Sequence, residues 1–148
     1  MISEEEVKEK IKEGWIKLNI FFEVLAINKE TAENSLNSLF EKFEKEQGVK
    51  IYSKKFGESS KVLNPMKGIN EAWSSTLEIT CIVKNFETAI NLIIVYGPSA
   101  IEIIEPKELK ININAAQTVL NSVAGIMHQF AAAGIGGIVF VNPKSEKK

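Results

Sequence analysis

The chain of 148 residues contains no arginine, a single cysteine and a single histidine. Its 18 basic residues are all lysine, and 19 acidic residues offset them to a net charge of −1. Arginine is the side chain that reads guanine edges and holds phosphate through two bonds, so its absence argues against sequence-specific nucleic-acid binding. A net charge this close to zero also provides no overall field that would attract a polyanion.

Cysteine usage and the N-terminal residues bear on the compartment. Cys81 has no second cysteine with which to form an internal disulfide. The chain begins with charged residues where a secretory signal would be apolar, and its apolar runs are too short to cross a bilayer. We therefore expect a cytoplasmic protein with no membrane partner. The many lysines and isoleucines, with no arginine, favour an AT-rich genome of the kind found in archaea and thermophiles.

The length and composition are those of one ordinary globular domain. With 45% hydrophobic and 25% charged residues, the chain is far from the composition of disordered segments. A length of 148 residues is close to the commonest domain size, so we expect a single domain over 1–148. Within it, we expect a core at about 15–110 and a C-terminal helix and strand at about 111–143.

Two hydrophobic periods alternate along the first part of the chain. Apolar residues at every second position predict strands, whereas apolar residues three and four apart predict helices. Between 53 and 70, glycine, serine and proline interrupt both patterns, which indicates a long unstructured loop. The predicted strands span 15–26, 49–52, 73–83 and 100–105, and the predicted helices lie within 3–14, 28–48 and 85–97.

The order of these elements predicts the fold class. After the first helix, the chain follows a strand–helix–strand unit, a long connection and a second strand–helix–strand unit. This is the split βαβ order of a ferredoxin-like α+β fold, an antiparallel sheet with two helices on one face. To this core the sequence adds an N-terminal helix and, at its C-terminal end, one more helix and a short strand.

The most unusual feature is a charge-free segment of 33 residues at 111–143. Positions 115–133 have the composition of a helix, and 138–141 that of a short strand. A helix that faces water normally carries charged side chains, so we expect this one to contact another helix in a homo-oligomer, a dimer or larger. The alternative is that it covers the open face of its own sheet. The expected interface residues form its polar stripe: Gln117, Asn121, Gly125 and His128.

No residue is predicted to be catalytic, and no metal or cofactor is expected. Cys81 and His128 are the only conceivable nucleophile and base, but Cys81 occupies an inward strand position, where a thiol behaves as a small hydrophobe. One histidine and one cysteine cannot supply the ligands of a zinc site. The carboxylates of Glu102, Glu105 and Glu108 do not follow a calcium-loop pattern, so they are interpreted as a solvated strand end.

Lysines gather in the expected loop at 53–70, where they outnumber the acidic residues. A flexible basic loop can close over an anion, and a neighbouring aromatic ring can stack on a base. The loop therefore predicts an alternative function in phosphate or nucleic-acid binding. The candidate ligand-binding residues are Lys54, Lys55, Lys61, Lys67 and Trp73, together with His128 of the C-terminal helix.

About a quarter of the chain, at 75–109, resembles the C-terminal extension domain of WYL-domain transcriptional regulators. The resemblance is carried by Tyr96, Gly97 and Pro98 after the expected second helix of the core, then by an edge strand that leads to Glu105 and Pro106, and by Leu109. That domain is ferredoxin-like, so the resemblance implies the same fold here. It also implies an oligomerising or ligand-sensing module.

Three functions follow from these observations. The first is a non-catalytic, homo-oligomeric binding or regulatory module, with a small molecule or a protein as its unknown ligand. The second is phosphate or nucleic-acid binding through the lysine-rich loop. The third is an enzyme whose site is assembled between subunits around His128, with Gln117 and Asn121 near it on the same helix.

Overall fold

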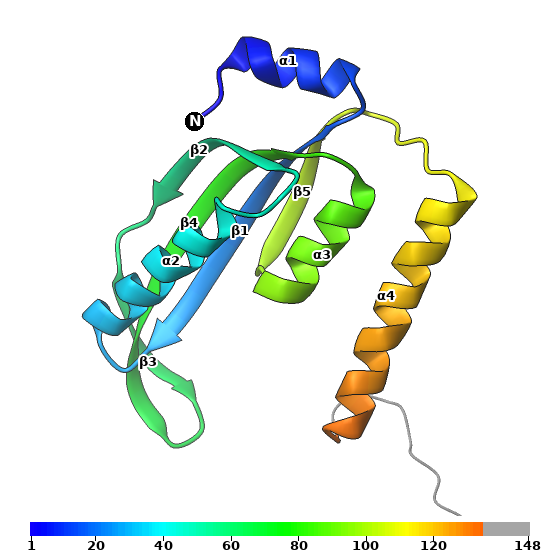
Figure 1. Ribbon diagram of the computed structural model, residues 1–148. Helices are drawn as coiled ribbons and strands as arrows, with labels where there is room; N and C mark the ends of the chain where they lie inside the picture. The colour runs from blue at the N-terminus through cyan, green and yellow to red at the C-terminus, as the bar shows by residue number, and fades with distance from the viewer. Residues whose placement is uncertain (135–148) are drawn as a thin grey trace, which may run out of the picture. The chain divides into compact units, whose positions relative to one another are not determined.

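A computed structural model of the chain describes residues 1–134 (Figure 1). Its contacts group into two compact units, Met1–Lys110 and Ile111–Lys148. In the described part of the chain, the first unit holds the strands and three helices, and the second holds a fourth helix. The predicted strand at 138–141 lies outside the described residues.

The first unit contains a four-stranded antiparallel sheet extended by a hairpin. Strands β2, β4, β1 and β5 lie side by side in that order. Helices α2 and α3 each connect two strands that are not neighbours, which is the split βαβ arrangement. The predicted α+β, ferredoxin-like fold is therefore confirmed. The elements are α1 (Glu4–Lys12), β1 (Ile16–Ala26), α2 (Lys29–Phe43), β2 (Val49–Phe56), β3 (Ser60–Met66), β4 (Ile69–Val83), α3 (Phe86–Tyr96) and β5 (Ala100–Glu105).

Local sequence sets where the two connecting helices begin and where α3 ends. Asn28 and Asn85 are extended residues, and the side chain of each accepts a hydrogen bond of 2.8 Å from the backbone N–H three residues further on. Such caps satisfy a backbone donor that the first helical turn leaves free. Helix α3 ends at Gly97, whose φ of 56° lies in the left-handed region that glycine adopts without strain.

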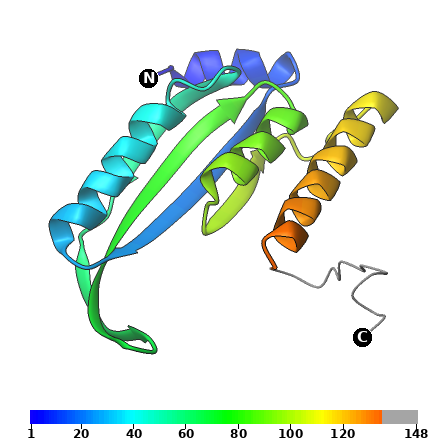
Figure 2. The ribbon, with the colours of Figure 1, turned by 60° about the horizontal axis from the view of Figure 1, so that its bottom comes forward.

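Helices α2 and α3 cover one face of the sheet, and the main core lies between them and the strands (Figure 2). Alternate residues of the central strands point into this core, as their period of two requires. The helices contribute residues three and four apart. The cluster includes Ile16, Leu18, Ile20 and Phe22 of β1, Leu77, Ile79, Cys81 and Val83 of β4, Leu36, Phe40 and Phe43 of α2, and Ala89 and Leu92 of α3.

The opposite face of the sheet is polar along its centre and is covered by α1 at one end. Asn19 of β1 donates a 2.9 Å hydrogen bond to Glu78 of β4 and accepts one of 3.2 Å from Thr80. Val7 of α1 and Ile82 of β4 are buried, yet neither belongs to the main core cluster. Because α1 also contacts β1, we infer that α1 covers the Ile82 end of this second face.

The loop expected at 53–70 is instead a β-hairpin, so that prediction was wrong. Strand β2 continues to Phe56, and β3 pairs with the first half of the long β4. The side chains of β3 are exposed except for Val62 and Pro65, which are half-buried. A ribbon with water on both sides needs no alternation of apolar residues, and its backbone hydrogen bonds to β4 hold it in place.

The second unit contains α4 (Ile113–Ala132), a helix of 20 residues. The predicted helix at 115–133 is therefore present and begins two positions earlier. Asn112 caps it by accepting a 2.8 Å hydrogen bond from the N–H of Ala115. The hydroxyls of Thr118 and Ser122 donate to backbone carbonyls four residues earlier, at 3.0 and 2.9 Å. No helix within residues 1–134 is long and apolar enough to cross a membrane.

Candidate functional site

Within the described residues of the second unit, the apolar face of α4 is exposed. Leu120 is 64% exposed, Val123 46%, Met127 37% and Phe130 46%, and α4 has no buried residue. A single helix cannot bury its own apolar face, so this face needs a surface supplied by something else. Contiguous apolar surface of this kind marks interaction sites in soluble proteins.

The predicted interface residues lie together on one side of α4. Gln117, Asn121, Gly125 and His128 are spaced by four, four and three positions, which places them in one stripe along the helix. All four are exposed, and the amide of Gln117 donates a 3.3 Å hydrogen bond to the side-chain oxygen of Asn121. The stripe is polar without charge. Its part in an interface between subunits stays a prediction.

A second exposed apolar surface belongs to α3 and β5. Helix α3 buries only Ala89 and Leu92, although most of its residues are apolar. It lies over β5, a strand at the edge of the sheet (Figures 1 and 2). The α3–β5 isoleucines are each 37% to 45% exposed, and they are Ile93, Ile94, Ile101 and Ile103.

The lysines predicted to bind an anion are distributed over β2 and the hairpin of β3 and β4. Lys54 of β2 places its ammonium 4.1 Å from the centre of a phenylalanine ring of α2. Lys61 of β3 forms a 3.0 Å ion pair with Glu71 of β4. Lys55 and Lys67 are exposed, the first on β2 and the second in the turn after β3. Because two of the four cations already have partners, the hairpin is a weaker anion site than a flexible loop would be.

Two further predicted site residues have defined places in the fold. Trp73 is half-buried on β4, between Ala26 of β1 and Lys61 of β3, so its ring is part of the sheet surface. His128 is exposed on α4. Nothing in the packing of either residue indicates a base-stacking or acid–base role by itself.

The single thiol is not a nucleophile in this fold. Cys81 is fully buried on β4, and burial raises the pKa of its thiol to about 12. A thiol in this state is not ionised near neutral pH, and the thiolate is the reactive form. Within residues 1–134, no group of three or more histidine, cysteine or acidic side chains could hold a metal ion, and this includes the carboxylates of Glu102, Glu105 and Glu108.

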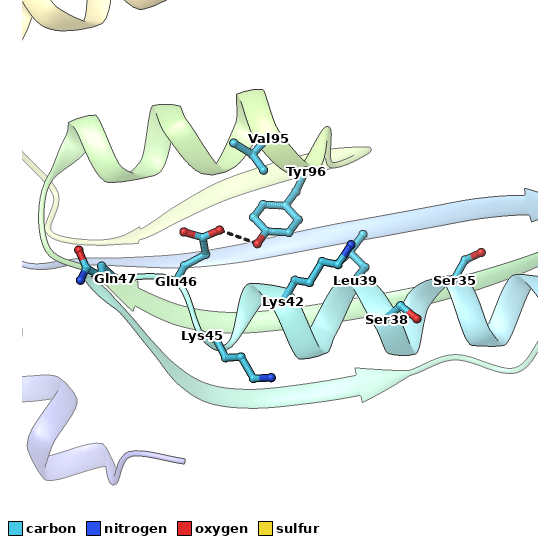
Figure 3. A pocket seen from close by; sticks show the side chains of 9 residues that line it. All are labelled: Ser35, Ser38, Leu39, Lys42, Lys45, Glu46, Gln47, Val95 and Tyr96. Carbon is cyan, nitrogen blue, oxygen red and sulfur yellow. Dashed lines mark hydrogen bonds between the residues drawn. The ribbon is translucent and has the colours of Figure 1, made fainter.

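A groove of about 880 Å³ runs between α2 and the end of α3 (Figure 3). Its volume lies within the range of small-molecule sites. The apolar part of its surface comes from Leu39, Val95 and the ring of Tyr96. The polar part consists of Ser35, Ser38, Lys42, Lys45, Glu46 and Gln47.

A hydrogen bond ties the two sides of this groove together. The hydroxyl of Tyr96, the last residue of α3, donates to the carboxylate of Glu46 at 2.6 Å (Figure 3). Burial raises the pKa of Tyr96 to about 12, and the hydrogen bond and negative charge of Glu46 act in the same direction. The phenol therefore stays protonated and continues to donate at physiological pH.

A smaller cavity of about 190 Å³ lies where the end of β2 passes α2. Ser75, which is 2% exposed, hydrogen-bonds to Ser59, whose hydroxyl donates to Glu33 of α2 at 2.9 Å. The backbone is packed closely here, because a Cβ added at Gly57 would overlap the hydroxyl of Thr76. We interpret this network as a structural tie between the hairpin and α2.

Comparison with known families places the chain. It belongs to the MJ0538 family, whose model matches residues 17–147. The matched range includes both the sheet and the charge-free segment. No curated protein and no solved structure matches the chain. The resemblance of 75–109 to the extension domain of WYL-domain regulators is untouched by this match and stays a prediction.

Sequence reasoning missed the groove and the α3–β5 isoleucines. The groove joins residues that are far apart in sequence, since Tyr96 and Glu46 are separated by 50 positions. The sequence contains one local signal for each. Most residues of α3 are apolar, more than the single face that a helix can bury against a sheet, which indicates an exposed apolar surface. The helix also ends in Tyr96, beside the Gly97 cap, where the tyrosine forms part of the groove.

Proposed function

We propose that this protein is a non-catalytic, homo-oligomeric binding module that assembles through α4. The observation that carries the proposal is a helix without any charged residue whose apolar side chains are not covered by the described residues of its own unit. Fully burying a side chain of this size contributes roughly 1.5–3 kcal/mol, and covering Leu120, Val123, Met127 or Phe130, which are 37–64% exposed, contributes about half of that. Over four such residues on each of two copies, this is comparable with the free-energy cost of association.

A second copy of the chain is the partner that suits this helix. Most soluble oligomers are symmetric homo-oligomers, in which one surface meets the same surface of another subunit. The stripe of Gln117 and Asn121 can match itself, because an amide both donates and accepts hydrogen bonds. With no charge on α4, there is also no pattern that would select a partner of opposite sign.

Two further observations support the proposal. The α3–β5 isoleucines provide more exposed apolar area in the first unit, and an assembly would gain by covering it. The absence of catalysis is supported by the buried state of Cys81, the single thiol of the chain. The lysines of β2 and the hairpin are not part of the proposal, because Lys54 and Lys61 are engaged within the fold.

Light scattering on three proteins tests the assembly. Wild type should have a mass that is a multiple of 16.5 kDa at micromolar concentration. Asn121→Lys places a charge in the polar stripe and should reduce the mass to that of one chain, because burying an unpaired ammonium is costly. Asn34→Lys makes the same substitution at an exposed position of α2, a helix that the proposal leaves outside the interface, and should leave the mass unchanged.

The outcomes separate clearly. A wild-type protein that is monomeric at micromolar concentration contradicts the proposal. Equal dissociation by Asn121→Lys and Asn34→Lys would show that an added charge acts without regard to its position, which also counts against the proposal. Circular dichroism of the three proteins should be the same, so that a change of mass is not caused by loss of the helix.

A further inference from the structure

The groove between α2 and α3 combines free cations with an apolar floor. We propose that it binds a small amphipathic anion, a molecule in which a carboxylate, sulfonate or phosphate group is joined to an apolar body. This inference names the ligand class of the binding module and rests on the binding part of the proposed function. It does not depend on assembly through α4.

Two lysines give the groove its preference for an anion. Lys42 lies in the last turn of α2 and Lys45 follows that helix. Within residues 1–134, neither lysine forms an ion pair with a carboxylate. Both lysines line the groove, and Figure 3 shows Lys45 directed away from Tyr96. Each ammonium stands on a flexible four-carbon stem, so both can turn toward an anion held in the groove.

The one acidic side chain of the groove is already engaged. Glu46 accepts the 2.6 Å hydrogen bond from Tyr96 and is turned toward the α3 side in Figure 3. Because the phenol keeps its proton at physiological pH, it can donate this bond under those conditions. It holds the carboxylate on one side of the groove and leaves Lys42 and Lys45 to an incoming anion.

The apolar floor excludes a purely polar ion as the ligand. Leu39 and Tyr96 are half-buried and pack against the main core, whereas Val95 is 67% exposed. An inorganic ion would leave this surface in water. A ligand with an apolar body would cover it and gain from its burial, and the groove of about 880 Å³ has room for such a body.

Two fluorescent probes of the same shape test the inference. Anilinonaphthalene sulfonate carries the anionic group, and phenylnaphthylamine is the same ring system without it. The double variant Lys42→Gln/Lys45→Gln should bind the sulfonate about tenfold more weakly than wild type, because each ammonium contributes a few-fold in affinity near water. Its affinity for phenylnaphthylamine should not change. The control Lys8→Gln/Lys12→Gln removes the same charge from α1 and should bind both probes as wild type does.

A variant of opposite sign sharpens the test. Glu46→Gln removes the negative charge of the groove, and its amide oxygen can still accept from Tyr96. It should bind the sulfonate about threefold more tightly than wild type. Binding of either probe to α4 or to the α3–β5 isoleucines would be the same in all these variants, so it cannot produce the pattern.

The proposal is overturned if the sulfonate does not bind saturably to wild type, if the groove and α1 variants bind it alike, or if the groove variant loses both probes equally. Light scattering on the same variants measures their mass in solution, and this reports assembly independently of probe binding. Failure of the groove and failure of the assembly therefore give different results.

Discussion

Replacing Tyr96 by phenylalanine tests the bond that shapes the groove. The hydroxyl donates to the Glu46 carboxylate at 2.6 Å, while the ring packs 5.2 Å from the ring centre of Phe43 in the core. Phenylalanine keeps the ring contact and removes only the donor. Hydrogen bonds to charged groups contribute about 1.5–3 kcal/mol, and partial exposure places this one at the low end. We expect the free energy of unfolding to fall by about 1–1.5 kcal/mol, or about 3–5 °C in Tm.

Burial of the phenol, together with this bond and the charge of Glu46, predicts how the effect depends on pH. The pKa of Tyr96 is about 12 in the folded protein, against an ordinary value of 10.0. The folded state thus favours the protonated phenol, and the stabilisation is complete below the unfolded pKa. It is lost as the pH rises from about 10 to about 12, through the folded pKa. Wild type should lose its advantage over Tyr96→Phe across this interval.

Urea denaturation followed by circular dichroism at a series of pH values measures both effects. Tyr52→Phe is the control, because Tyr52 lies on β2 with its ring centre 4.9 Å from the ammonium of Lys17, and its contact is with this cation instead of the carboxylate of Glu46. It should cost little at any pH. An equal loss for Tyr52→Phe and Tyr96→Phe near neutral pH, or a Tyr96→Phe deficit that persists unchanged to pH 12, would refute the reasoning.

Two further predictions concern the sheet. Gly57→Ala should lower the free energy of unfolding by about 1–3 kcal/mol, because its Cβ would overlap the Thr76 hydroxyl. In a Thr76→Ala background most of that cost should vanish in urea denaturation, and an equal cost in both backgrounds would argue against the overlap. The Cys81 thiol should be unreactive toward an aromatic disulfide reagent in the folded protein near neutral pH and fully reactive in guanidinium, because burial raises its pKa to about 12. Rapid reaction of the folded protein would contradict this.

The sheet and its two covering helices were predictable because each element shows its own period against a core. Along β1, Ile16, Leu18 and Ile20 are buried, and the residues between them face the other side. Asn28 and Asn85 mark the starts of α2 and α3 by local chemistry alone. Each of these patterns involves only residues that are close together in the chain, so it can be recognised in a single sequence.

The hairpin was not predictable by the same reasoning because it extends past the helices. Lys61 and Glu71 pair across β3 and β4 with both side chains in water, so neither strand shows alternation at that point. The hairpin forms because β4 begins as early as Ile69, well before the part of the strand that is buried in the core. The backbone of this first half of β4 forms hydrogen bonds with β3. The groove could not be predicted from the sequence for a related reason, because Glu46 and Tyr96 come together only when α2 and α3 have packed on the sheet.

The distribution of charge over the four helices described supports one arrangement of the proposed assembly. Helices α1 and α2 carry lysine and glutamate throughout, as helices in water do. Helix α3 has a single charged residue, Glu87, and α4 has none. Charged residues are depleted at the buried centre of protein interfaces and common on surfaces that face water. By this criterion an assembly covers α3 and α4, whereas α2 stays in water. The proposed anion site has one wall on each helix, because Val95 and Tyr96 belong to α3 and Lys42 lies on α2, so an assembly of this kind would reach the α3 wall and leave the two lysines of the site in water.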